Sequence, residues 1–242
     1  AGVLTSETRL AEADQRLREA ISIAATAMEE DDNEAIILYS QRANLFLLRE
    51  DYAPAEPLCR RIVAMSEKAF GPENVEVARP LVLLAAVYSS LRKFSSAESA
   101  SQRALAILEK QPDPDQLAIA GAWNNLTVVY TGTGDYGRAE HAFEEAIRLI
   151  EQRYGPTHPD LSTMLTNGAD LYCKMSRFEQ AKSLAERAWK LDEQTRGPKS
   201  LLVARDLRVY AAALRGMKQK SAARKHEAMA KSILQLHDAA GH

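Results

Sequence analysis

Apolar and polar positions along this chain follow the three- and four-residue steps of amphipathic helices. In residues 117–131 these steps predict a helix with one face formed by Ala120, Trp123, Leu126, Thr127 and Tyr130. In residues 136–153 they do the same at Ala139, Phe143, Ala146 and Ile150. The four residues between these stretches, Gly-Thr-Gly-Asp, break the first helix because glycine supplies the backbone angles of a tight reversal. Gly155-Pro156 ends the second, since proline cannot continue a helix. The pattern predicts two antiparallel helices joined by a short turn.

The same pair recurs with a period of 42 residues, and several columns of residues keep this register without insertions. The columns hold prolines after the second helix, aromatic residues at its start, alanines within it, and large residues late in the first helix. They are Pro72, Pro114, Pro156 and Pro198; Tyr52, Phe94, Tyr136 and Phe178; Ala55, Ala97, Ala139, Ala181 and Ala223; and Phe46, Tyr88, Tyr130, Tyr172 and Leu214. The small alanines predict that the two helices approach each other closely.

The repeats predict an all-α solenoid of antiparallel helix pairs. Five units are visible within residues 33–236, and we expect them to form one domain because a hairpin buries its apolar faces only against its neighbours. Residues 1–32 are interpreted as an N-terminal capping half-repeat, built on a helix over residues 5–30. The last full unit is the most polar, which suits a terminal cap, and residues 237–242 are expected to be a C-terminal tail.

The charge balance argues against two classes of partner. The 242 residues include 31 Lys or Arg and 33 Asp or Glu, so the net charge is −2. Nucleic acids and anionic membranes select basic surfaces, so neither is expected as a partner. No apolar run is long enough to insert into a membrane. No signal peptide is evident at Ala1. The compartment stays open, with the cytoplasm favoured over an exported bacterial protein whose signal has been trimmed.

Neither a catalytic centre nor a metal or cofactor site is predicted. The five histidines lack the spacing of a zinc helix, and surface or loop positions are expected for them: His141, His158, His226, His237 and His242, the last two on the C-terminal tail. The glycines of the 132–135 turn follow no strand and precede no lysine at the spacing of a phosphate loop. Cys59 is expected in the core. Cys173 is a candidate reactive thiol, and the two cysteines are too far apart in the array for a disulfide.

The third unit resembles the tetratricopeptide repeat. Its residues match the signature of that family at Trp123, Leu126, Tyr130, Gly134, Tyr136, Ala139, Phe143 and Ala146. The 42-residue period, Trp-Asn-Asn-Leu at 123–126 and Tyr-Gly-Pro-Thr-His-Pro at 154–159 are similar to the long-helix class found in kinesin light chains and in many bacterial proteins. The C-terminal end of the chain resembles bacterial members. The resemblance implies a right-handed superhelix, and it covers nearly the whole chain.

The resemblance also implies that the first helix of each unit lines a concave groove that holds a peptide. Carrying the groove positions over by register gives eight candidate peptide-binding residues: Asn44, Arg79, Asn124, Asn125, Asn167, Asp170, Arg205 and Arg208. An asparagine amide both donates and accepts, so it can pair with any peptide backbone. Arginine suits carboxylates, and with Arg215 the C-terminal end of this groove is expected to prefer an acidic segment. The alternative is that these are solvated polar residues on an exposed face.

These observations favour a protein-interaction module over an enzyme. Its partner is expected to be a protein, bound as a peptide or a helix in the groove. Binding of chaperone tails is not expected, because Ser40 and Leu83 stand where the family's carboxylate clamp has Lys and Asn. A second hypothesis is a structural scaffold that self-associates into a homo-oligomer through its terminal helices. A third is a regulatory domain of a larger enzyme.

Overall fold

The computed structural model describes residues 14–20, 33–49 and 51–238, and all regular elements within these ranges are helices. Residues 14–20 are helical, whereas the rest of the helix predicted over residues 5–30 and the tail residues 239–242 lie outside the described residues. The chain divides into two compact units, with the boundary along the sequence between Gly132 and Thr133. Each unit is described by itself below.

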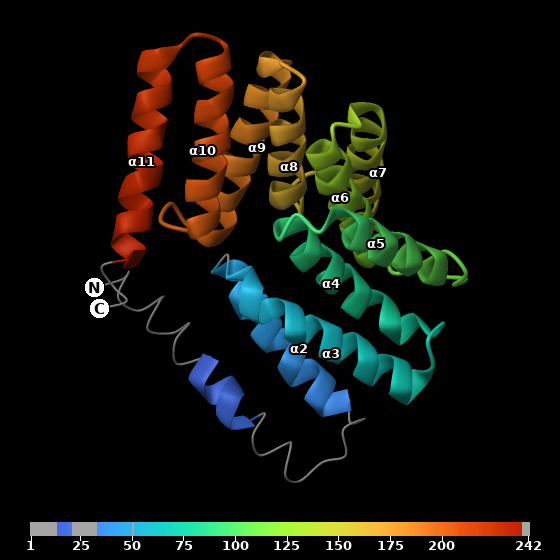
Figure 1. Ribbon diagram of the computed structural model, residues 1–242. Coiled ribbons are helices and arrows are strands. Elements are labelled where there is room, and N and C mark those ends of the chain that lie inside the picture. Colours follow the sequence, from blue (N-terminus) through green and yellow to red (C-terminus); the bar gives the residue numbers. More distant parts are fainter. Residues whose placement is uncertain (1–13, 21–32, 50, 239–242) are drawn as a thin grey trace. The chain divides into compact units, whose positions relative to one another are not determined.

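The amino-terminal unit contains consecutive antiparallel helix pairs (Figure 1). Its elements are α2 (Asn33–Leu48), α3 (Tyr52–Phe70), a short 3₁₀ helix η1 (Val75–Val77), α4 (Ala78–Ser90), α5 (Phe94–Leu108) and α6 (Gln116–Thr133). Helix α2 pairs with α3, α4 pairs with α5, and α4 also packs against α3. The second helix of one pair is thereby covered by the first helix of the next, as repeat stacking requires.

The carboxy-terminal unit repeats this arrangement. Its elements are α7 (Tyr136–Tyr154), α8 (Leu161–Lys174), α9 (Phe178–Arg196), α10 (Leu201–Gly216) and α11 (Lys220–Asp238). Helices α8 and α9 form one hairpin and α10 and α11 the next, with α10 lying against α9 (Figure 1). The stacked hairpins confirm the predicted all-α architecture of repeated helix pairs.

The turns inside the hairpins share a left-handed residue at one position of the repeat. Arg92, Ser176 and Lys218 have φ angles of 58°, 59° and 62°, and Gly134 has 82° at the corresponding place. In the Ser176 turn the following N–H, of Arg177, donates to the carbonyl of Tyr172 at 2.8 Å, which closes the helix end. Only one of the four positions carries the glycine that this conformation favours. The sequence therefore signals the reversal clearly in the third unit alone.

The predicted four-residue turn at 132–135 was too long. Helix α6 continues through Thr133, so only residues 134 and 135 connect it to the next helix. Position 132 requires glycine for a different reason than the turn. A Cβ atom there would lie 2.3 Å from the ring of Phe94. The glycine makes room for an aromatic ring rather than a reversal. Gly168 does the same for Phe143 in the carboxy-terminal unit, again with a 2.3 Å separation.

The predicted alanine columns lie in the core of both units. All members of the 55-to-223 column are at most 2% exposed, as are Ala104, Ala146, Ala188 and Ala230 in the neighbouring column. Side chains of this size let helix backbones approach closely, and larger ones would separate the pairs. The close approach of the helices that the sequence predicted is confirmed.

Two histidines expected at the surface or on a tail are packed instead. His237 lies in the last turn of α11, is 6% exposed, and has its Nε2 atom 2.8 Å from the carbonyl oxygen of Lys199. His226 is half-buried, with its ring 4.9 Å from that of Tyr210 and 5.8 Å from that of Trp189. His237 is covered because helix α11 extends two residues past the predicted end of the repeat, to Asp238, and His226 is covered by the rings of Trp189 and Tyr210.

Candidate functional site

The four predicted groove residues of the amino-terminal unit have different surroundings. Asn44 on α2 is exposed, and Asn124 on α6 is half-buried. Arg79 at the start of α4 is exposed, and its Nε donates to Asp115 Oδ2 at 2.6 Å, just before α6 begins. Because this ion pair is largely solvated, it adds little stability and leaves the guanidinium accessible.

Asn125 does not lie on an open face, contrary to expectation. Its side chain is 5% exposed, and its Nδ2 donates to the backbone carbonyl of Val82 at 2.8 Å. The bond ties α6 to α4 one repeat earlier, where the register places the two first helices against each other. A buried amide needs such a partner, since an unpaired one costs about 1–3 kcal/mol. Asn125 therefore supports the stacking of repeats, and little of its surface is available to a peptide.

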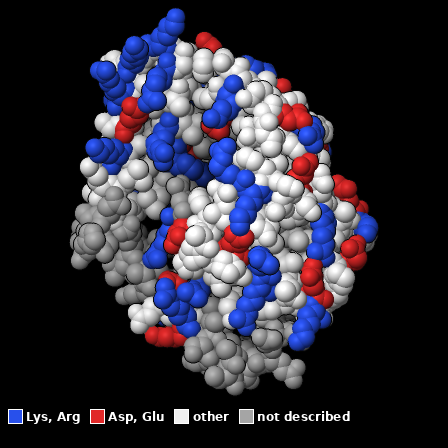
Figure 2. Space-filling view, viewed as in Figure 1, with Lys and Arg blue, Asp and Glu red and all other residues white. Residues whose placement is uncertain are grey.

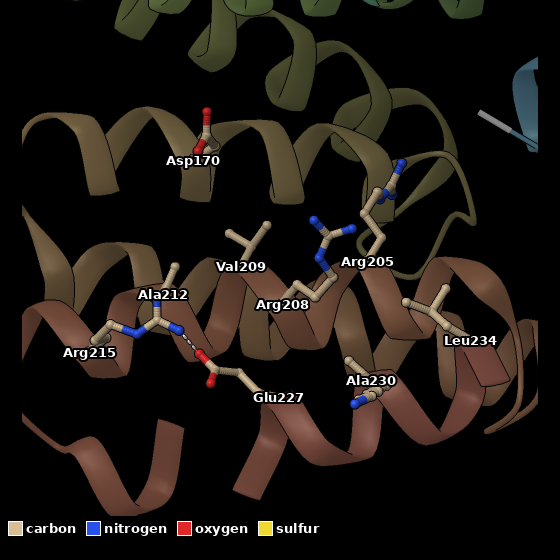
Figure 3. A pocket seen from close by; sticks show the side chains of 10 residues that line it. Asp170, Arg205, Arg208, Val209, Ala212, Arg215, Glu227, Ala230 and Leu234 are labelled. Atoms are coloured by element: carbon tan, nitrogen blue, oxygen red, sulfur yellow. Dashed lines mark ion pairs between the residues drawn. The ribbon is translucent and has the colours of Figure 1, made fainter. Parts of the chain in front are cut away.

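In the carboxy-terminal unit, three predicted residues line one cavity. It has a volume of about 610 Å³ and lies along α8, α10 and α11 (Figure 3). Asp170 comes from α8 and Arg205 and Arg208 from α10, while Asn167, half-buried on α8, is outside the lining. The remaining lining residues are Val209, Ala212, Arg215, Glu227, Ala230, Lys231 and Leu234. The contribution of α11 was missed, because the register of groove positions considers only the first helix of each pair.

The cationic groups of the cavity differ in how firmly they are held. Arg205 Nη2 donates to Thr163 Oγ1 at 3.3 Å and lies 3.5 Å from Asp206 Oδ1. Arg215 forms an ion pair with Glu227, drawn in Figure 3. Arg208 and Lys231 are exposed and form no hydrogen bond or ion pair with other described residues. The cavity thus has two available cations beside an apolar floor of alanine, valine and leucine side chains.

Two buried carboxyl groups near this cavity were not predicted from the sequence. Asp206 on α10 and Asp192 on α9 are both 0% exposed. Thr166 Oγ1 lies 2.6 Å from Asp206 Oδ1, and Asp192 forms an ion pair with Arg196. Burial raises the pKa of Asp206 from 3.8 to about 7, an effect that Arg205 and the Thr166 hydroxyl oppose and the adjacent Asp192 carboxyl reinforces. One signal was available: Asp206 and Asp192 replace the apolar Met164 and Ile150 of the preceding unit.

The surroundings of Cys173 do not favour its thiolate form. The side chain is half-buried on α8, and burial raises its pKa to about 11, with a smaller contribution from Asp170. Cys59 is fully buried, and burial raises its pKa to about 12. A raised pKa lowers the fraction of thiolate, which is the nucleophilic form. Partial burial on α8 therefore argues against the candidate reactive thiol at Cys173.

The described residues contain no group of three or more His, Cys, Asp or Glu side chains arranged to hold a metal ion. None of the helices in the described ranges is both long and apolar enough to cross a membrane.

Comparison with known proteins supports the resemblance found in the sequence. The tetratricopeptide repeat family model matches residues 34–110, 118–194 and 160–235. No curated protein sequence matches the chain. Among solved structures, BtubC (BKLC) from P. vanneervenii is similar with 19% identity and a TM-score of 0.61, covering 96% of this chain and 92% of its own. A putative kinesin light chain from Podosopora anserina has 17% identity and a TM-score of 0.57, with coverages of 85% and 96%.

A third structure, the apo form of RapI, has 12% identity and a TM-score of 0.61, covering 96% of this chain and 95% of its own. At these identities the similarity concerns the fold. The family matches cover most of the chain, in the register that the 42-residue columns define. The chain therefore belongs to the tetratricopeptide repeat family.

Proposed function

We propose that this chain is a protein-interaction module that holds a segment of a partner protein along α8, α10 and α11. The observation that carries the proposal is the convergence of Asp170, Arg205 and Arg208 on one cavity of about 610 Å³. These residues come from two repeats, so a bound segment would contact both. A cavity with an apolar floor and a few polar groups at its edge suits a segment that combines apolar and charged side chains.

The arrangement of the cationic groups supports binding rather than simple solvation. Arg205 is fixed by Thr163 and Asp206, so little side-chain entropy is lost when it engages a ligand. Arg208 is exposed nearby and has no partner among the described residues. The apolar surface beside them would leave water on binding and would supply most of the affinity.

The proposal can be tested by affinity capture from an extract of the native cell. The test variant is Asp170→Ala combined with Arg208→Ala, which removes one negative and one positive charge from the cavity. The matched control is Glu145→Ala combined with Arg148→Ala, which removes one negative and one positive charge from α7, where the two side chains form an ion pair. Circular dichroism shows whether both variants fold. We expect the wild type and the control to capture the same partner and the cavity variant to lose it.

Equal capture by all three proteins would contradict the proposal and place binding elsewhere on the chain. If nothing is captured and sedimentation shows a stable oligomer, the self-associating scaffold becomes the better hypothesis.

A further inference from the structure

The cavity lies where the register would place the first helix of another repeat. In the preceding hairpin, α10 covers the corresponding face of α8 and α9. Ala185 packs in one cluster with Tyr210, Ala211 and Leu214 of α10. Trp189 packs against a second cluster that contains Val203, Ala204 and Leu207 of α10, and Thr166 contacts Asp206 of that helix at 2.6 Å.

The last hairpin carries different residues at these covered positions. One repeat further along, Ala185 becomes Glu227, Trp189 becomes Lys231 and Thr166 becomes Arg208. All three line the cavity, together with Ala230, which occupies the place of the buried Ala188. The last hairpin thus has a small residue at the same position as the preceding hairpin, which allows a helix to approach. At the three other positions it has charged residues where the preceding hairpin has residues covered by α10.

The charge on this hairpin is strongly one-sided. Residues 201–238 contain eight Lys or Arg and three Asp or Glu, although the whole chain has a net charge of −2. Figure 2 shows Lys and Arg side chains gathered over the part of the face where Figure 1 places α10 and α11. A terminal cap needs only a wettable surface, which mixed charges would provide equally well. An excess of positive charge on this surface favours a partner with a negatively charged surface.

We propose that the face formed by α10 and α11 binds an acidic amphipathic helix of a partner protein, in the position of a further repeat's first helix. This inference rests on the proposed function and specifies the chemistry of the partner. The apolar side of the helix would lie on Val209, Ala212 and Leu234. Its carboxylates would reach Arg208 and Lys231, the two cavity cations that have no partner among the described residues.

A fluorescence-anisotropy titration of the full chain tests this inference. The probe is a fluorescein-labelled amphipathic peptide of about 20 residues, long enough to form a helix, with Leu and Ala on one face and Glu on the others. A second probe carries Lys in place of every Glu. The test variant is Lys231→Glu. The matched control is Arg224→Glu, the same charge change on an exposed residue of the same helix outside the cavity.

We expect the wild type to bind the Glu peptide and not the Lys peptide, with far-UV circular dichroism showing a gain of helix on binding. Lys231→Glu replaces an attraction with a repulsion and should weaken binding about tenfold at low salt. Arg224→Glu should weaken it less than about threefold, because its charge is farther from the bound helix.

Three results would overturn the inference: equal binding of both peptides, equal weakening by the two variants, or a dimer that Lys231→Glu dissociates, which would assign the face to a second copy. Capture of a cellular partner that depends on Asp170 and Arg208, with no binding of the Glu peptide, would leave the proposed function standing and remove only the acidic helix.

Discussion

Replacing Asp206 with asparagine should make the protein more stable at alkaline pH. The carboxyl is 0% exposed, and the equally buried Asp192 reinforces the rise in its pKa. An ionised Asp206 would place a second negative charge beside Asp192 in a medium that screens charge poorly. Asparagine has nearly the same shape as the protonated acid. Its Oδ1 can still accept from the Thr166 hydroxyl, and its amide can donate to the Asp192 carboxylate.

The sign and size follow from the pKa of Asp206 in the folded and unfolded states. Folding raises this pKa from 3.8 to about 7, so between these values the folded chain keeps a proton that the unfolded chain has released. The stability that this proton contributes is complete below pH 3.8 and is lost as the pH rises through 7. Since one pKa unit corresponds to about 1.4 kcal/mol, the wild type should lose roughly 2–3 kcal/mol between pH 5 and 8 through this group. Asp206→Asn should not show that loss.

The assay is urea denaturation followed by circular dichroism at several pH values between 5 and 8. Asp170→Asn is the control, because it makes the same chemical change at an exposed carboxylate of the same unit. The histidines are the same in all three proteins, so any contribution from them cancels in the difference from the wild type. We expect the stability difference between Asp206→Asn and the wild type to grow with pH, while the control stays parallel to the wild type. A difference that is constant from pH 5 to 8 would show that Asp206 is not protonated in the folded state and would refute the reasoning.

Three further predictions concern packing, backbone strain and thiol reactivity. Gly168→Ala should cost about 1–3 kcal/mol in urea denaturation, because the new methyl group would overlap an aromatic ring, whereas Gly137→Ala, with open space around it, should be neutral or slightly stabilising. Ser176→Gly should raise the free energy of unfolding by about 1 kcal/mol by relieving a left-handed backbone, and an unchanged or lower value would contradict this. Mass spectrometry after iodoacetamide treatment at pH 7 should find Cys173 modified slowly and Cys59 only after unfolding; rapid labelling of either folded thiol would contradict the burial argument.

The candidate site was only partly predictable. The register placed Asp170, Arg205 and Arg208 on first helices, and the structure brings these three to one cavity. The register of the repeats could not show that α11 completes the cavity with Lys231 and Glu227. Whether a second helix lines a groove depends on whether another repeat covers it, which is a property of the stacked array and not of the helix itself.

The sequence by itself determined the repeat, the helix pairs and the columns of small core residues. These features depend on local periodicity and on glycine and proline at helix ends, which one-dimensional spacing records directly. The tertiary structure decided which polar residues are covered. Asn125 was predicted to face the groove and no role was predicted for Asp206, yet α4 buries one, and the packing of α10 against α8 and α9 buries the other. Burial depends on the neighbouring repeat, so the pKa of Asp206 and the loss of Asn125 from the groove follow from the packing of helices that are distant in the sequence.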